Sequence, residues 1–188
     1  MIENKNQLRK EIRQKVDVED RKEKEERIIE NLLSSELFSE SDYVFLYASH
    51  KNEISVDRIA LSAERLGKKT AFPFCENRDG GMKFYFTNLS DLKEGMYGIR
   101  EPDKEKSEEV FYTEKSLCIV PGVAFGLKGE RLGMGKGYYD RFLSKFTGKT
   151  VGLSFEERLC DNIPMDKHDI EIEYLVTENK IYKTSKEE

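Results

Sequence analysis

Glycines and cationic side chains gather in one stretch of this sequence, residues 122–149. Seven of the chain's 13 glycines lie there, together with six lysines or arginines and only two acidic residues. Glycines allow backbone N–H groups to approach anionic oxygens closely, and lysine and arginine add full positive charges. The stretch therefore predicts a phosphate-binding loop.

Two standard nucleotide-binding patterns do not fit this stretch. The Walker A pattern fails because Glu130 stands where a glycine is required and Gly137 where a serine or threonine is required. The dinucleotide pattern GxGxxG fails because Gly135-Lys136-Gly137 is followed by the letters YYD. Two alternatives stay open at this point: a nucleotide loop of another kind, and a flexible loop with incidental lysines.

The overall charge excludes one class of protein. The chain has 188 residues and a net charge of −5, of which the glycine-rich stretch contributes +4 and the remainder −9. A generally cationic protein that coats nucleic acid is therefore not expected. We expect a chain of this length to form one domain over residues 1–188.

Membrane, secreted and zinc-binding classes are also disfavoured. The sequence has no apolar run of the ~18–20 residues that a membrane span needs, and its charged first 20 residues do not resemble a secretory signal. Cys75, Cys118 and Cys160 are too far apart for a CxxC pair, and His50 and His168 are the only histidines. We expect a cytoplasmic protein, with structural cysteines and histidines.

The elements that position the loop are predicted from hydrophobic spacing. We expect two helices in the first thirty-odd residues, with Leu8, Ile12 and Val16 on one face of the first and Asp20 capping the second. Leu66 should face the core at the end of a helix before Gly67, and Pro73 should end a strand. Strands are predicted at 43–47, 70–73, 82–86, 117–120, 150–153 and 174–177, helices at 56–66 and 138–146, and a surface loop at 103–109.

The alternation of strands and helices predicts the fold class. We expect an α/β fold: a single three-layer domain with a mostly parallel central sheet and helices on both faces. Ligands should bind beyond the carboxyl ends of the parallel strands. The glycine-rich stretch follows the strand predicted at 117–120 and precedes a helix, which places it at that edge.

The letters GERLGMGKGYYDR at residues 129–141 closely resemble the signature of the 5-formyltetrahydrofolate cyclo-ligase family, also called 5,10-methenyltetrahydrofolate synthetase. The likeness extends to residues 5–9 (KNQLR), Glu53-Ile54, residues 98–102 (GIREP) and His168-Asp169, and so spans nearly the whole chain. The chain departs from the family pattern at Gly126, at Lys115-Ser116 and after Pro73, which concerns fine substrate contacts rather than the reaction.

The resemblance implies a ligase reaction with ATP and magnesium. The formyl oxygen of 5-formyltetrahydrofolate attacks the γ-phosphate of ATP, nitrogen-10 adds to the activated carbon, and phosphate leaves to give 5,10-methenyltetrahydrofolate. Water must be excluded, because the activated formyl group would hydrolyse. The implied partners are ATP and a reduced folate, with no nucleic acid and no membrane, and a monomer is expected.

The resemblance also implies roles for individual residues. Asp140 and Asp169 would hold Mg²⁺, and Arg131, Lys136 and Tyr138 would be catalytic. The ATP-binding residues would be Lys5, Asn6, Gln7, Leu8, Arg9, Arg131, Leu132, Gly133, Met134, Gly135, Lys136, Gly137, Tyr138 and Tyr139. The substrate-binding residues would be Ala48, Glu53, Met134, Gly135, Lys136, Gly137 and Tyr138, with Glu53 binding donors of the pterin ring.

Other interpretations of the same residues remain open in the sequence. Lys5 and Arg9 could lie on one more exposed face of a charged helix, and Asp140 could act only as an acid in the first turn of a helix. Of the two adjacent tyrosines, Tyr139 should be the more buried. The glycine-rich stretch could bind single-stranded nucleic acid, or the fold could activate another amide or carboxylate with ATP. A folate-binding relative without catalytic activity is a further alternative.

Overall fold

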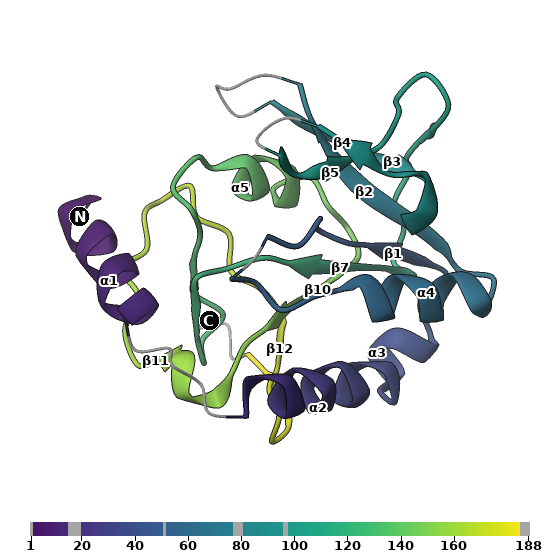
Figure 1. Cartoon of the computed structure of the whole chain (residues 1–188). Coiled ribbons are helices and arrows are strands. Elements are labelled where there is room, and N and C mark those ends of the chain that lie inside the picture. The colour runs from purple at the N-terminus through teal and green to yellow at the C-terminus, as the bar shows by residue number, and fades with distance from the viewer. Residues whose placement is uncertain (1, 15–19, 51, 77–80, 96–97, 185–188) are drawn as a thin grey trace.

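The structure is a computed structural model that describes residues 2–14, 20–50, 52–76, 81–95 and 98–184 (Figure 1). Its centre is an eight-stranded sheet of strand order β13-β12-β10-β7-β1-β2-β3-β6. The strands are β1 (Tyr43–Phe45), β2 (Lys69–Cys75), β3 (Met82–Phe86), β6 (Glu108–Glu109), β7 (Ser116–Val120), β10 (Lys149–Leu153), β12 (Tyr174–Val176) and β13 (Ile181–Lys183).

The central sheet is mixed. Strands β12, β10, β7, β1 and β2 run parallel to one another, whereas β13, β3 and β6 are added by antiparallel pairing at the two sides. The predicted mixture of helices and a large sheet is confirmed, but the expected mostly parallel sheet is not. Of the three antiparallel strands, β3 was predicted at 82–86, whereas β13 and β6 were missed; β6 lies in the charged segment 103–109, where we expected a surface loop.

The two faces of the sheet have separate cores. Along β7, Leu117 and Ile119 point to one core, and Cys118 and Val120 point to the other, as expected for a strand that is buried on both sides. The first core packs against α2 (Arg21–Leu33), α3 (Glu36–Ser39) and α4 (Asp57–Arg65). Among the described residues, the second is covered by one short helix, α5 (Tyr138–Leu143), and by aromatic side chains, so a regular three-layer arrangement is not confirmed.

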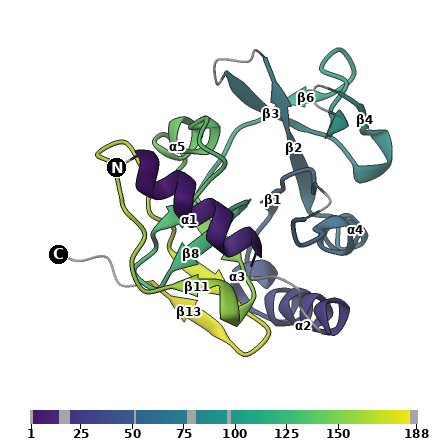
Figure 2. The same ribbon diagram turned by 60° about the vertical axis from the view of Figure 1, so that its left-hand side comes forward.

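A second, three-stranded sheet positions the N-terminal helix. It consists of β11 (Leu159–Cys160), β8 (Ala124–Gly126) and β9 (Arg131–Leu132). Leu8 and Ile12 of α1 (Ile2–Gln14) pack against Ala124 and Leu132 of this sheet. Figure 2 shows α1 lying across β8 and β11, so residues from the start of the chain reach the glycine-rich stretch.

Four local predictions from the sequence are wrong. Asp20 precedes α2 but adopts a left-handed conformation without a side-chain cap. Leu66 follows the end of α4 and is 67% exposed. Pro73 lies inside β2 and pairs with Phe84 of β3. On its other edge, β2 pairs with β1 only as far as Ala71, so β1 needs no N–H from residue 73, and a proline is tolerated there. The helix predicted at 138–146 ends at Leu143.

The remaining short elements are β4 (Lys93–Glu94), β5 (Arg100–Glu101), and the 3₁₀ turns η1 (Leu89–Asp91) and η3 (Glu156–Arg158). Val16, which was expected on the first helix, lies outside the described residues. Within the ranges that the structure describes, none of the helices has both the length and the apolar character needed to cross a bilayer.

Candidate active site

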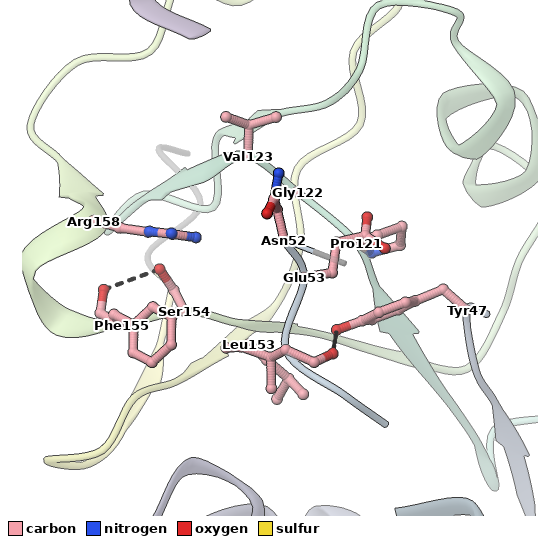
Figure 3. A pocket seen from close by; sticks show the side chains of 11 residues that line it. Tyr47, Asn52, Glu53, Pro121, Gly122, Val123, Leu153, Ser154, Phe155 and Arg158 are labelled. Atoms are coloured by element: carbon pink, nitrogen blue, oxygen red, sulfur yellow. Dashed lines mark hydrogen bonds between the residues drawn. The ribbon is translucent and has the colours of Figure 1, made fainter. Parts of the chain in front are cut away.

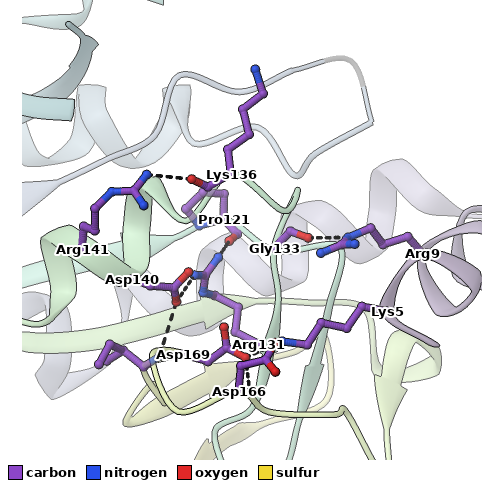
Figure 4. Close-up of polar contacts among 11 residues, drawn as sticks. Lys5, Arg9, Pro121, Arg131, Gly133, Lys136, Asp140, Arg141, Asp166 and Asp169 are labelled. Carbon is purple, nitrogen blue, oxygen red and sulfur yellow. Dashed lines mark hydrogen bonds and ion pairs between the residues drawn. The ribbon is translucent and has the colours of Figure 1, made fainter. Parts of the chain in front are cut away.

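Arg9 connects the N-terminal helix to the glycine-rich stretch. Its Nε donates a hydrogen bond to the carbonyl oxygen of Gly133 at 2.8 Å (Figure 4). Its Nη1 donates to Oδ1 of Asn6 at 2.7 Å. A Cβ atom on Gly135 would lie 3.3 Å from Nη2 of Arg9, so the absence of a side chain there leaves room for the guanidinium. The predicted meeting of helix and loop is therefore present.

Lys5 forms the second connection, to the segment before β12. Its ammonium forms ion pairs with Asp166 at 2.8 Å and with Asp169, and only 7% of the residue is exposed. Burial alone would lower the pKa of Lys5, but the hydrogen bonds and charges of the two carboxylates outweigh it and raise that pKa above 10.5. The alternative in which Lys5 is an ordinary exposed lysine is wrong.

Arg131 and Asp140 form a third ion pair close to the second. Nη2 of Arg131 donates to Oδ1 of Asp140 at 2.7 Å, and the backbone N–H of Ile170 donates to the same oxygen at 3.3 Å. Because Ile170 follows Asp169 directly, the two carboxylates predicted to share a metal lie in one neighbourhood (Figure 4). The guanidinium of Arg131 also lies over the ring of Tyr139, 5.9 Å from its centroid.

Two positions in this loop require glycine. Gly137 has a φ of 67°, in the left-handed region that glycine adopts without strain, immediately before α5. A Cβ atom on Gly133 would lie 2.6 Å from Nη1 of Arg131, closer than two such atoms can approach. The glycines thus allow the turn into α5 and let Arg131 pack against the backbone.

Some polar groups near this cluster are buried without a partner. Among the described residues, Nε of Arg131 and the hydroxyl of Tyr139 are shielded from solvent and make no hydrogen bond. Burial raises the pKa of the Tyr139 phenol, which therefore stays neutral. Unsatisfied buried donors cost free energy, and at a site they mark groups that a ligand can satisfy.

The carboxylates fit a magnesium site that the substrate completes. No group of three or more His, Cys, Asp or Glu side chains within the described ranges is arranged to hold a metal ion. Mg²⁺ characteristically binds one or two carboxylates together with phosphate oxygens. Asp140 and Asp169 supply two hard oxygen donors, so their chemistry fits this ion when a nucleotide is bound.

The tip of the glycine-rich stretch points away from the ion pairs. Figure 4 shows the Lys136 side chain extending away from Arg131 and Asp140. Its positive charge lowers the pKa of the Cys75 thiol at the end of β2, although burial raises that pKa overall. Met134 is 58% exposed, and the guanidinium of Arg141 lies over the Tyr138 ring at 6.0 Å. Of the three residues predicted to be catalytic, only Arg131 belongs to the buried cluster.

A narrow hollow lies at the carboxyl ends of β1, β7 and β10 (Figure 3). Its volume is about 20 Å³, enough for about one water molecule. The carboxylate of Glu53 accepts a hydrogen bond from the N–H of His50 at 2.8 Å, and burial raises the pKa of this carboxyl. The hollow is lined by Tyr47, Asn52, Glu53, Ile54, Pro121, Gly122, Val123, Leu153, Ser154, Phe155 and Arg158.

Pro121 joins this hollow to the ion-paired cluster. Its carbonyl oxygen accepts a hydrogen bond from Nη1 of Arg131 at 3.3 Å, and Pro121 itself lines the hollow. Pro121 thus contacts Arg131 and lines the same hollow as Glu53. A ligand beside Glu53 and a second ligand on the cluster would meet near Pro121.

Several predicted site residues face elsewhere. Leu132 and Leu8 pack in the core beneath α1, and Gln7 is exposed and donates to Glu11 at 3.1 Å. Ala48 is buried, 7% exposed, and does not line the hollow. These positions can present backbone atoms to a ligand, but Leu132 and Leu8 serve the packing of α1.

Two residues near the site were not predicted from the sequence. Asp166 shares Lys5 with Asp169, and its N–H donates to Oδ2 of Asp169 at 2.7 Å. Arg158 lines the hollow from η3, a position that no sequence pattern marked. The sequence could have indicated Asp166 only through its position three residues before Asp169. No sequence pattern indicated Arg158.

Comparisons with known proteins agree on one family. The model of the 5-formyltetrahydrofolate cyclo-ligase family matches residues 1–178. A probable 5-formyltetrahydrofolate cyclo-ligase of Caenorhabditis elegans is 29% identical over 179 residues, covering 88% of this chain and 87% of the relative. A probable 5-formyltetrahydrofolate cyclo-ligase of Schizosaccharomyces pombe is 34% identical over 147 residues, covering 70% of this chain and 72% of the relative.

A solved structure supports the same assignment. The NMR structure of Aquifex aeolicus 5,10-methenyltetrahydrofolate synthetase superimposes with a TM-score of 0.82 at 32% identity, covering 95% of this chain and 92% of that one. The ion-paired loop, the hollow beside it and these similarities lead to one assignment. The chain belongs to the 5-formyltetrahydrofolate cyclo-ligase family.

Proposed function

We propose that this protein catalyses the ATP- and magnesium-dependent cyclisation of 5-formyltetrahydrofolate to 5,10-methenyltetrahydrofolate, with release of ADP and phosphate. Family membership supports the cyclo-ligase activity. The observation that carries the nucleotide part is that Arg9 reaches the glycine-rich stretch at Gly133, while Lys5 on the same helix pairs with Asp169. The guanidinium groups of Arg9 and Arg131 lie against Gly135 and Gly133, and cations beside glycine backbone suit phosphate groups.

The reaction needs activation because an amide is a poor electrophile. In the proposed step the formyl oxygen forms a bond to the γ-phosphorus while the bond to the ADP oxygen breaks. Nitrogen-10 then adds to the formyl carbon and loses its proton, and the carbon–oxygen bond breaks as phosphate leaves. Phosphoryl transfer of this kind depends on positioning and charge neutralisation, which arginine and lysine side chains provide.

The ion pairs already bring together the cations and carboxylates that would bind ATP and Mg²⁺. In the protein without ligands, Arg131 is paired with Asp140, and Lys5 with Asp169 and Asp166. We infer that ATP offers its phosphates to Arg131 and Lys5, while Asp140 and Asp169 hold Mg²⁺, which neutralises phosphate charge. The cations and carboxylates would exchange partners rather than lose them, which limits the cost of desolvation.

The folate half of the site is assigned to the side of Pro121 on which Glu53 lies, where the hollow of about 20 Å³ would have to open to admit the ring. Glu53 would accept hydrogen bonds from the N–H donors of the pterin ring, and Pro121 would separate this ring from the phosphates. Met134, Gly135, Lys136, Gly137 and Tyr138 form the tip between the two ligands, where they would exclude water. Lys136 and Tyr138 contact the reacting groups in this proposal only after the tip closes over them.

The proposal is tested by mixing the purified protein with ATP, Mg²⁺ and 5-formyltetrahydrofolate and following the absorbance of the methenyl product. We expect a signal that requires all three and is abolished by a chelator. An absorbance change without ATP, or none with all components, would refute the proposal. Stoichiometric release of ADP and phosphate distinguishes this reaction from activation of another amide or carboxylate.

We further propose that residues 1–188 act as one unit, as a monomer in the cytoplasm, without nucleic acid or membrane as a partner. The net charge of −5 opposes general attraction to nucleic-acid phosphates. Light scattering at working concentration measures the mass, and a mass of twice 21.9 kDa would overturn the monomer.

A further inference from the structure

The guanidinium of Arg141 contacts three consecutive residues at the tip of the glycine-rich stretch. Its Nη2 donates a hydrogen bond to the carbonyl oxygen of Lys136 at 2.7 Å (Figure 4). Its Nη1 lies 3.0 Å from the position that a Cβ atom on Gly137 would take, and its Cζ lies 6.0 Å from the centroid of the Tyr138 ring. One side chain therefore contacts a carbonyl, a glycine and a ring that follow one another in the chain.

The helix that carries Arg141 is fixed in the core. Leu143 of α5 is buried. The ring centroid of Phe142 lies 4.5 Å from that of Phe84 and 5.3 Å from that of Phe146, and aromatic contacts of this kind add to the stabilisation that burial provides. Arg141 is exposed, so its guanidinium contributes little to this packing. The side chain thus connects a fixed helix to an exposed tip.

Both ends of the loop at residues 131–136 are attached to this helix. Asp140 pairs with Arg131 at 2.7 Å, where the loop begins, and Arg141 bonds to the Lys136 carbonyl at 2.7 Å, where the loop ends. Neighbouring residues of a helix point about 100° apart around its axis, so the two contacts lie on different sides of α5. The proposed binding of Mg²⁺ to Asp140 would change the first contact and leave the second intact. Arg141 can therefore hold the tip while ligands are bound.

On the basis of the proposed function, we infer that Arg141 is a positioning residue, which fixes the part of the backbone from which Lys136 and Tyr138 act. The peptide unit between Lys136 and Gly137 is planar, so a hydrogen bond to its carbonyl fixes the orientation of the whole unit. Without that bond, Gly137 would let the unit rotate, because glycine tolerates both signs of φ. The side chains on either side of this unit would then lose their common orientation.

Loss of this contact should uncouple ATP hydrolysis from cyclisation. In the proposed reaction the tip excludes water from the phosphorylated formyl group. Where water enters, its oxygen adds to the formyl carbon in place of nitrogen-10, the carbon–oxygen bond to phosphate breaks, and loss of a proton regenerates the formyl amide. The net reaction is then hydrolysis of ATP to ADP and phosphate, with the folate unchanged. A protein without the Arg141 guanidinium should therefore release more phosphate than it forms methenyl product.

The first test measures phosphate and methenyl product together for Arg141→Met, which keeps the apolar stem and removes the donor. We expect kcat for the methenyl product to fall about tenfold, the KM for ATP to stay within about threefold, and phosphate release to exceed methenyl formation. Arg141→Lys keeps a donor and a positive charge and should restore part of the coupling. Arg58→Met should change neither quantity and is the matched control, because Arg58 is also an exposed helical arginine and pairs with Glu30.

The second test does not require activity. Trypsin cleaves after lysine, and Lys136 is exposed, so the cut after Lys136 reports how often the tip opens in the protein without ligands. We expect Arg141→Met to be cut there at least about threefold faster than the wild-type protein, because opening of the tip no longer breaks the bond from Arg141. The urea midpoint should stay unchanged, since the guanidinium lies outside the core.

Three outcomes would overturn the inference. An unchanged rate of cleavage after Lys136 would show that Arg141 does not hold the tip, and equal amounts of phosphate and methenyl product would show that holding it does not exclude water. A raised KM for ATP with a normal kcat would show that Arg141 binds the nucleotide itself. If the wild-type protein forms no methenyl product, the proposed function fails instead, and the cleavage rates still decide whether Arg141 holds the tip.

Discussion

Lys5 and Asp169 form an ion pair although 164 positions separate them in the sequence. The pair attaches the first helix to the segment before β12, and Asp166 accepts a second hydrogen bond from the same ammonium at 2.8 Å. Asp169 is predicted to hold magnesium, whereas Asp166 is not, so the two carboxylates can be distinguished by experiment.

Asp169→Asn should impair the magnesium requirement. The variant keeps Lys5 paired with Asp166, but it removes a proposed ligand of the ion. We expect the Mg²⁺ concentration for half-maximal turnover to rise at least about tenfold, as measured by magnesium titration of the absorbance assay. Asp166→Asn is the matched control and should change that concentration much less. Similar titrations for both variants would contradict the assignment of the metal site.

Arg9→Gln should weaken the use of ATP. The substitution removes a guanidinium that reaches the glycine-rich stretch, and charge-assisted bonds to phosphate of this kind correspond to about ten- to a hundredfold in affinity. We expect a KM for ATP raised by at least about tenfold and an unchanged KM for the folate. Lys10→Gln, at an exposed neighbouring position of α1, should leave both constants unchanged. If only the KM for the folate rises, Arg9 binds the folate and its assignment to ATP is wrong.

Gly137→Ala should reduce both stability and activity. Alanine at a φ of 67° costs about 1–2 kcal/mol of unfolding free energy, and its Cβ would approach Nη1 of Arg141 to 3.0 Å. Gly67, with a φ of 72°, has no atom within 4 Å of such a Cβ, so Gly67→Ala is the control for backbone strain alone. Urea unfolding should show similar losses for both variants, and only Gly137→Ala should lose turnover. Full activity of Gly137→Ala would show that the turn is not needed.

Glu53→Gln should weaken folate binding and alter the pH dependence of stability. Burial raises the pKa of Glu53 above its ordinary value of 4.5, so the folded state holds this proton more tightly than the unfolded state. Its contribution to stability is therefore present at low pH and is lost as the pH rises through the folded pKa. Relative to wild type, Glu53→Gln should become more stable as the pH increases from about 4 to 7.

Urea unfolding at several pH values measures this difference, and calorimetry with 5-formyltetrahydrofolate measures the loss of binding. A variant that is less stable than wild type at neutral pH would contradict the role of burial. Asp57→Asn, which alters an acid that is paired with Arg100 instead of being buried alone, is a suitable control for the pH effect.

The site was predicted from the sequence more completely than the fold around it. Residues 129–141 are contiguous, so one pattern identifies Arg131 and Asp140 together, and the structure pairs them at 2.7 Å. Lys5 and Arg9 were expected on the same ligand, and in the structure α1 brings Arg9 to Gly133 and Lys5 to Asp169. Arg158 could not be predicted, because its position depends on how η3 folds back over Phe155.

The antiparallel strands were the hardest elements to predict. β13 and β6 are short, and β6 consists of two glutamates whose pairing with Phe86 and Tyr85 is set by the backbone of β3. Hydrophobic spacing reports which side chains are buried, not which backbone edge accepts a further strand. The prediction that Pro73 ends a strand was wrong for the same reason. Whether a strand can contain a proline depends on where the neighbouring strand ends.

The docking of α1 also determines when the site can form during synthesis on the ribosome. Leu8 and Ile12 pack on a sheet that includes β11, and Lys5 forms its ion pairs only with Asp166 and Asp169, which are translated much later. Helix α1, which precedes all of these residues in the chain, therefore has no complete docking surface until residue 169 has emerged. Nascent chains that end before residue 166 should leave this helix unprotected from protease, and its protection should arise late, with the ability to bind nucleotide.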